Sequence, residues 1–347
     1  LDNSLVSGQV RNGRVRIHGR LDQIPFDNGE GQQEVRLPVF NATLDFNDGW
    51  TPITGQDAQV NFTGRSMDIT SSRGMIRTAA LRQVRARIPD LARPGLSIDG
   101  DVRGELSVML AELGSSPLGK RFGGFVDRAI TTGRCDLQLD IGIPLHGVNR
   151  DVSVAGRISL RDNTLKLKNS EIALGAIRGL LTFDGDGIAG DDLQTIMNGR
   201  PATVRVWGEP GKPDTYIRLD GKLGLLDVML GKDSTLQRAA SGDSDWQVQL
   251  TVRGAPARGE QGDVGLHITS TLAGTAIDLP APFGKSAGSQ RPISVTLDNA
   301  AATLQRATFN YGDQLQGILL LDTRGSTCLL YTSPSPRDFS CNLVCRR

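Results

Sequence analysis

The sequence predicts a mainly β protein: an elongated, curved antiparallel β-sheet that forms a groove, with two or three short helices. One phrase of alternating apolar and polar residues, with glycine in fifth place, recurs at 15–21, 96–102, 152–158 and 217–223. A period of two is that of a half-buried strand with one apolar face. Glycine accounts for 42 of the 347 residues, and glycine inside strands marks the bulges and bends that curve a sheet.

The first third of the chain predicts strands joined by short turns. Asn12-Gly13 is one such turn, and its residue types are those of tight hairpins. Short connections favour antiparallel pairing of neighbouring strands. The expected strands lie near residues 10–21, 34–46, 58–63, 66–70, 81–88 and 96–110.

A helix is expected at 117–130, because its apolar residues fall on one helical face. Ser116 and Pro117 fit the start of this helix, and Gly133 fits its end. The pattern leaves open whether the helix packs against the sheet or gates the groove.

Strands resume at Cys135 and alternate without a break to Ile143. Short helical stretches are expected at 225–230 and 234–240. The other expected strands lie near residues 152–160, 164–167, 177–183, 202–207, 216–223, 246–252, 264–272, 293–297, 302–310 and 315–321.

These elements divide the chain into a β-groove segment at 1–110, a helical insertion at 111–133 and a β-groove segment at 134–327 that continues the same sheet. Residues 328–347 read as the translation of a sequencing-library adapter, so we expect them to be disordered. Three of the four cysteines lie in that tail, which leaves Cys135 alone. A disulfide or a cysteine metal site is therefore not expected.

The composition argues against several classes of protein. The 39 basic and 38 acidic residues are interspersed, so no basic face for nucleic acid is expected. No stretch reaches the roughly 18 apolar residues of a membrane span. The chain begins at Leu1 without a signal peptide, and we expect an internal segment of a longer protein.

No motif predicts catalysis, a cofactor or a metal. The run Gly185-Asp-Gly187-Ile-Ala-Gly190 formally matches a dinucleotide fingerprint, but its aspartates would face the pyrophosphate. It also lacks the terminal glutamate of a calcium loop, so an acidic turn is the better interpretation. The three histidines, none with a metal-binding companion at helical spacing, are His18, His146 and His267. We therefore expect no enzyme, no cofactor and no metal.

The apolar strand faces are compatible with two architectures. One long sheet that curls with its apolar face inward makes a trough. Two or three consecutive β-sandwiches would instead close the same residues into separate cores. The alternation by itself does not choose between them.

Short phrases spread over residues 1–327 carry a family resemblance. They include Leu21-Asp-Gln-Ile-Pro-Phe-Asp-Asn-Gly-Glu-Gly31, Phe62-Thr-Gly-Arg-Ser-Met-Asp-Ile69, Val84-Arg-Ala-Arg-Ile-Pro-Asp-Leu91 and Leu279-Pro-Ala-Pro-Phe-Gly-Lys285. Together they resemble the YhdP family of AsmA-like proteins, which are related to TamB.

The resemblance implies an AsmA/TamB-like β-groove that carries phospholipid through the periplasm toward the outer membrane. It implies an anchor in the bacterial inner membrane through an N-terminal helix absent from this fragment. The implied partners are phospholipid acyl chains and, through the missing terminal regions, the inner and outer membranes. The resemblance supplies no catalytic residues.

A continuous apolar groove suits such a cargo. Exposing acyl chains to water costs ~0.8 kcal/mol per methylene, and apolar contact is non-directional, so a lipid can slide past similar positions. The alternative is a non-catalytic structural or adhesive β-repeat protein with closed sandwich cores. The candidate groove-lining residues are Leu137, Leu139, Ile141, Ile143, Val152, Val154, Ile158, Leu160, Val204 and Val206.

Overall fold

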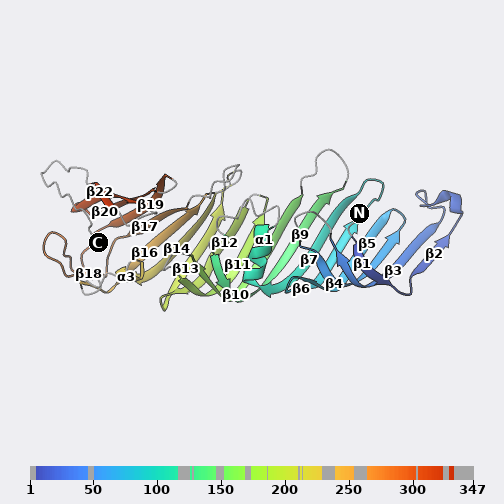
Figure 1. The fold of residues 1–347 in the computed structure, drawn as a ribbon, viewed down its shortest axis with the longest axis horizontal. Helices are drawn as coiled ribbons and strands as arrows, with labels where there is room; N and C mark the ends of the chain where they lie inside the picture. Colours follow the sequence, from blue (N-terminus) through green and yellow to red (C-terminus); the bar gives the residue numbers. More distant parts are fainter. Residues whose placement is uncertain are drawn as a thin grey trace. The chain divides into compact units, whose positions relative to one another are not determined.

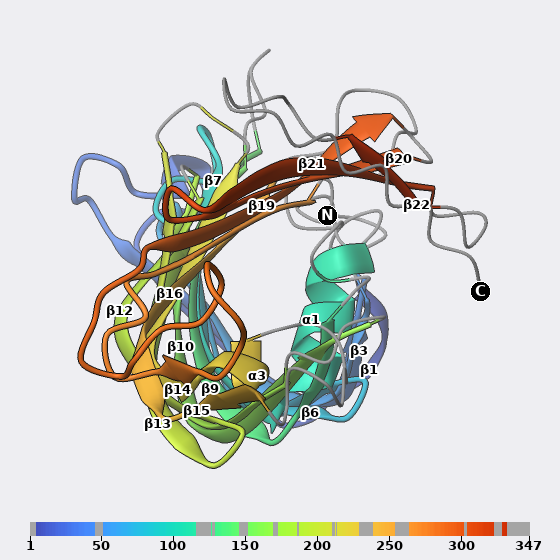
Figure 2. The same cartoon turned by 90° about the vertical axis from the view of Figure 1, so that its left-hand side faces the viewer.

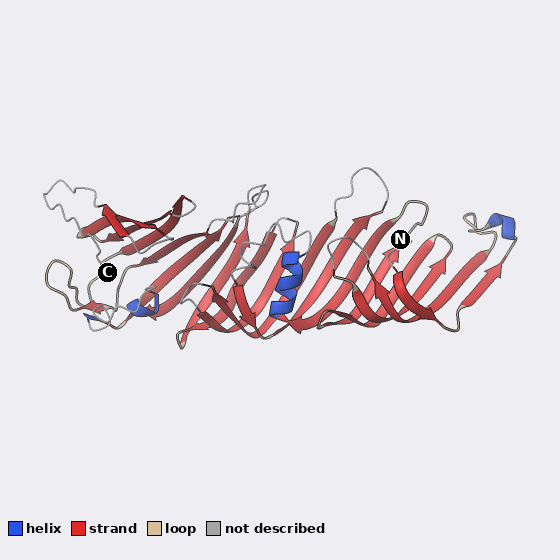
Figure 3. Ribbon diagram, in the orientation of Figure 1, coloured by secondary structure: helices blue, strands red, loops and turns tan. Residues whose placement is uncertain are grey.

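The computed structural model confirms a mainly β chain, in which strands far outnumber helices (Figure 3). Twenty strands belong to one sheet, and every described strand pair with a residue-by-residue register is antiparallel. The structure describes residues 5–45, 51–115, 126, 129–145, 152–168, 173–185, 187–209, 212, 214–228, 239–253, 264–301, 304–322 and 328–331.

The chain divides into two compact units, which are described separately. Figure 1 labels the strands and helices of the chain. Unit 1 comprises Leu1–Phe122, Thr131–Asn163 and Leu180–Asp186. Unit 2 comprises Gly123–Ile130, Thr164–Gly179 and Gly187–Arg347.

In unit 1, the chain order of the strands is largely their order in the sheet. Both β1 (Leu5–Val10) and β2 (Arg14–His18) pair with β3 (Gln32–Leu44). From β3 onward each strand pairs with the next, except that β7 pairs with β9 rather than with β8 (Ala129–Thr132). The strands in this series are β4 (Ile53–Thr63), β5 (Ser66–Ile76), β6 (Ala79–Ile88), β7 (Gly95–Glu105), β9 (Arg134–Pro144) and β10 (Ser153–Leu167).

Helix α1 (Leu106–Ser115) follows β7 directly and lies on the inner side of the curved strands of unit 1 (Figure 2). Its Val108 and Met109 pack against a cluster of buried side chains, Ala79, Leu81 and Val102. The strand expected at 96–110 therefore ends at Glu105, because the following apolar residues cover the end of the apolar sheet face instead of extending the strand.

The helix expected at 117–130 lies largely outside the described residues. Its last two positions, Ala129 and Ile130, belong to β8 instead. These residues are drawn into the sheet by pairing with β10, which overrides their fit to a helical face. The helix expected at 234–240 also falls almost entirely outside the described part of the chain.

Unit 2 repeats the antiparallel order. Its strands pair consecutively, apart from the separate two-stranded sheet formed by β15 (Ala240–Ser241) and β18 (Ala276–Ile277). A single helical turn, α3 (Leu225–Val228), follows β14 within the helical stretch expected at 225–230. The strands of the main sheet are β12 (Gly187–Met197), β13 (Arg200–Gly208), β14 (Thr215–Gly224), β16 (Asp243–Val252), β17 (Val264–Ser270), β19 (Ile293–Ala301), β20 (Leu304–Tyr311), β21 (Leu315–Asp322) and β22 (Cys328–Tyr331). Three of the described strands contribute residues to both units, namely β8, β10 and β11 (Ala173–Asp184).

Strand β12 is the longest of the strands that the sequence analysis missed. Asp192 has a positive φ of 54°, and the register with β13 shifts between Gly190 and Leu193. This bulge interrupts the period of two on which strand assignment depends. Gly187, within the sequence that formally matches the dinucleotide fingerprint, begins β12, whereas the fingerprint requires a helix there.

At the start of the expected tail, Cys328–Tyr331 form β22, which pairs antiparallel with β21. Residues 332–347 lie outside the described residues, so the expectation of disorder there stays a prediction.

Candidate apolar binding face

In unit 1, one row of apolar side chains crosses seven consecutive strands. Each member lies directly opposite the next in the register, in the order Leu37, Val60, Ile69, Ala86, Ile98, Ile141 and Val154. The adjacent row on the other face is polar or small, and consists of Arg36, Asn61, Asp68, Arg87, Ser97, Gly142 and Ser153. Because side chains alternate along a strand, the first row belongs to one apolar face and the second to a polar face.

Most of the apolar face is only half-buried. Leu139 and Ile158 are of this kind, and so are Leu37, Val60 and Ile98. A second sheet packed across the face would bury these side chains completely, as in a sandwich core. The described residues contain one other sheet, the two-stranded β15–β18 sheet of unit 2, so no second sheet of unit 1 is described that could cover this face.

The structure brings most of the predicted residues of unit 1 together. Leu137, Leu139 and Ile141 of β9 lie opposite Ile158, Gly156 and Val154 of β10, and Cys135 lies opposite Leu160. Ile143 is on the same face of β9, opposite Leu96 of β7. Val152 precedes β10 and is 39% exposed, so it lies at the margin of the face.

Unit 2 has an apolar face built in the same way. The row from β12 to β21 contains Leu193, Val204, Leu219, Val248, Ile268, Val295, Phe309 and Gly317. Its neighbour contains Val206, Ile217, Leu250, Leu266, Leu297 and Ala307. The two predicted valines, Val204 and Val206, are therefore on this face and are both buried.

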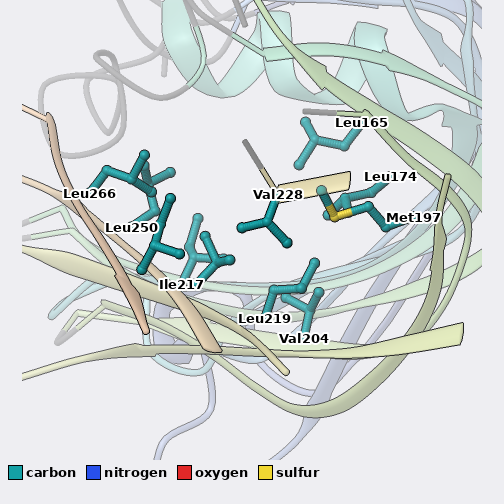
Figure 4. A pocket seen from close by; sticks show the side chains of 11 residues that line it. Leu165, Leu174, Met197, Val204, Ile217, Leu219, Val228, Leu250 and Leu266 are labelled. Carbon is teal, nitrogen blue, oxygen red and sulfur yellow. The ribbon is translucent and has the colours of Figure 1, made fainter. Parts of the chain in front are cut away.

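A hollow lies in this face, with Val228 of α3 projecting into it (Figure 4). Its cavity volume is only about 60 Å³, so the surrounding side chains nearly fill it. The lining side chains are all aliphatic or thioether groups, namely Leu165, Leu174, Met197, Val204, Ile217, Leu219, Val228, Val248, Leu250, Leu266 and Ile268. Such a lining solvates hydrocarbon and offers no side-chain partner to a polar ligand.

Sequence reasoning named only Val204 among these lining residues. Val248, Leu250, Leu266 and Ile268 alternate within strands that were expected, so their shared face was available from the period of two. The place of Val228 had no such signal, since a single helical turn has no periodicity that fixes the direction of one side chain.

The family model described as YhdP protein matches residues 1–331. The chain belongs to the YhdP family. No solved structure matches it.

One curated relative of this YhdP-family chain is the protein named "Intermembrane phospholipid transporter YhdP" of Escherichia coli (strain K12). The two sequences are 23% identical over 305 residues, which cover 86% of this chain and 23% of the relative. The chain thus spans less than a quarter of that relative's length. Among the described residues, no helix is both long and apolar enough to cross a membrane.

The polar face of this YhdP-family chain carries its charges in cross-strand groups. In unit 1, Arg103 pairs with Asp136, and Arg161 Nη2 lies 3.5 Å from Asp136 Oδ2. The hydrogen bond from Arg103 lowers the pKa of Asp136. Asp140 lies opposite Asp99, and the hydrogen bond between these two carboxyl groups, helped by burial and by the Asp99 charge, raises the pKa of Asp140.

Two of the polar residues that the sequence analysis weighed make ordinary contacts. Arg205 Nε forms an ion pair with Asp191 Oδ1 at 2.7 Å, and His267 Nδ1 lies 2.9 Å from Thr296 Oγ1. No group of three or more potential metal ligands gathers within the described part of the chain. The apolar face is therefore the feature from which a function is best argued.

Proposed function

We propose that this chain is a segment of a periplasmic phospholipid carrier and that acyl chains lie on its apolar face while the head groups stay near water. The observation that carries the proposal is the apolar row from Leu37 to Val154, whose members are mostly half-buried and which crosses seven strands without a charged member. The printed name of the Escherichia coli relative, an intermembrane phospholipid transporter, supports the choice of cargo.

The physical role of such a face is to replace water around hydrocarbon. Transfer of acyl chains into water costs ~0.8 kcal/mol per methylene, which for a two-chain lipid comes to a few tens of kcal/mol. Contact with aliphatic side chains removes most of this cost without fixing the lipid at one position. The chain needs no catalytic group for this task, and we propose that it is not an enzyme.

The finer parts of the proposal concern the whole protein. We propose an anchor in the bacterial inner membrane, an extended path through the periplasm and movement of phospholipid toward the outer membrane. The proposed contact residues in this segment are the ten predicted ones, Leu137, Leu139, Ile141, Ile143, Val152, Val154, Ile158, Leu160, Val204 and Val206.

The test compares two adjacent residues on opposite faces of β9. The chain is purified from bacteria, and its bound phospholipid is measured by mass spectrometry for the wild type, Leu139→Glu and Gln138→Glu. Leu139 is half-buried on the apolar face, and Gln138 is exposed on the polar face. We expect Leu139→Glu to lower the lipid-to-protein ratio severalfold and Gln138→Glu to leave it unchanged.

Circular dichroism of each variant checks that the sheet is retained. A wild-type chain that folds and carries no phospholipid above a non-binding control protein would refute the proposal. It would favour the alternative of a structural or adhesive β protein.

A further inference from the structure

The single turn α3 places one side chain in the middle of the apolar hollow of unit 2. Leu225 and Val228, the first and last residues of α3, are 6% and 4% exposed. Figure 4 shows Val228 between the side chains of Leu250 and Leu266 on one side and those of Leu174 and Met197 on the other. Val228 therefore occupies space that an acyl chain on this part of the face would otherwise fill.

A set of polar contacts holds α3 at this place. Arg200 Nε lies 3.1 Å from Asp227 Oδ2, and another nitrogen of the same guanidinium group pairs with Asp243. Asp227 Oδ2 also accepts a hydrogen bond from the Gly224 backbone N–H at 2.9 Å. The side-chain amide of Asn198 donates to the backbone oxygen of Asp227 at 3.4 Å. The turn between β12 and β13, which contains Asn198, and the start of β16 at Asp243 thus fix the helical turn.

These contacts decide where α3 lies, because four residues do not form a stable helix by themselves. The backbone pairing of β13 with β14 does not involve these side-chain contacts. β13 and β14 are joined by continuous pairing from Ala202 opposite Gly221 to Gly208 opposite Thr215. Loss of Arg200 would therefore release α3 and leave the strands in place.

We propose that α3 is a plug in the apolar path, with Val228 as the side chain that limits the acyl-chain cross-section the hollow accepts and Arg200 as the residue that holds the plug. This inference rests on the proposed function. The occupant is hydrocarbon, because the eleven lining side chains include no charged or hydrogen-bonding group.

The experiment uses a phosphatidylcholine with a photoactivatable diazirine in one acyl chain. The intact chain is illuminated with this lipid, and labelled peptides are mapped by mass spectrometry. Val228→Ala is expected to raise labelling of peptides from the hollow severalfold, and Val228→Trp to lower it severalfold. Labelling of β7 and β9 should stay at the wild-type level in both variants and serves as the internal reference.

Arg200→Gln removes the ion pairs to Asp227 and Asp243 and should raise labelling of the hollow as Val228→Ala does. Two controls match these changes. Val252→Ala shortens a buried valine of β16 that does not line the hollow, and Arg205→Gln breaks an ion pair on the polar face of β13, the strand that also holds Arg200. Neither control should alter labelling of the hollow.

The outcomes separate this inference from the proposed function. Equal labelling of the hollow in wild type, Val228→Ala and Val228→Trp, with β7 and β9 labelled normally, would overturn the plug and leave lipid binding intact. Absence of labelling at β7, β9 and the hollow in every protein would overturn both. Because the alanine and tryptophan variants change the hollow in opposite directions, loss of folding in one still leaves the other as a test.

Discussion

Ile141 of β9 lies directly opposite Val154 of β10, in a register that runs without a bulge from Cys135 to Gly142. On its other side, Ile141 lies opposite Ile98 of β7, again within an uninterrupted register. Three strands are thus locked together by strict alternation of apolar and polar residues. A slip of one residue would move every apolar side chain to the polar face, so the alternation itself specifies the pairing.

This central pair predicts a graded effect of truncation along β9. Ile141 is 6% exposed, and Ile141→Ala should lower the free energy of unfolding by about 2–5 kcal/mol, because it removes buried methyl groups and leaves a cavity. Leu139 is half-buried on the same face, and Leu139→Ala should cost roughly half as much. Urea unfolding followed by circular dichroism measures both. Equal losses would mean that the face is covered uniformly, against the open arrangement.

A second prediction concerns the glycine in the recurring phrase. A Cβ at Gly156 would lie 2.5 Å from both the Gln138 backbone oxygen and Phe183 Cζ. Gly156→Ala should therefore lower the free energy of unfolding by about 1–3 kcal/mol. Gly100 occupies the same place in the phrase on β7, but its nearest contact would be at 3.5 Å, to Val84. Gly100→Ala should be neutral or stabilising by about 0.4–1 kcal/mol, because it restricts the unfolded chain.

Chemical unfolding of the two glycine variants under one set of conditions gives the comparison. If Gly100→Ala proved as costly as Gly156→Ala, glycine would be needed for backbone geometry throughout the phrase. The ring of Phe183 and the neighbouring strand would then not be the cause.

The particular strands show what the sequence could predict and why. From Cys135 to Ile143 the period of two is unbroken, and both the strand and its apolar face were predictable. At Gly190–Leu193 a bulge breaks the period, and β12 was missed although it joins the same sheet. Only the register shows that an apolar row continues from strand to strand across the sheet, because single-strand patterns contain no information about pairing.

In the candidate site, too, some features follow from local sequence patterns and others do not. The apolar faces of β9, β10 and β13 follow from alternation. The position of Val228 depends on Arg200, which contacts Asp227 and Asp243 at separations of 27 and 43 residues in the chain. No local pattern encodes contacts of that kind.

A third prediction concerns the alkaline stability of unit 1. Cys135 is buried, with Sγ 3.2 Å from Met109 Sδ of α1. Burial, with smaller effects of the Asp136 and Glu105 charges, raises the pKa of the thiol from 9.0 to about 11. Between these two values the unfolded chain has released the thiol proton while the folded chain still holds it. The free energy of unfolding should therefore fall as the pH rises through this window, and it should be unaffected by this thiol below it.

The measurement compares urea unfolding of the wild type and Cys135→Ala at about pH 8 and about pH 10.5, which lie on either side of the unfolded-state titration. Other groups titrate in the same range, so the informative quantity is the difference between the two proteins. The wild type should lose more stability on alkalisation than Cys135→Ala does, because only the wild type must keep a buried thiol protonated. Parallel losses in the two proteins would show that the Cys135 thiol is open to solvent, and that α1 does not cover this end of the apolar face.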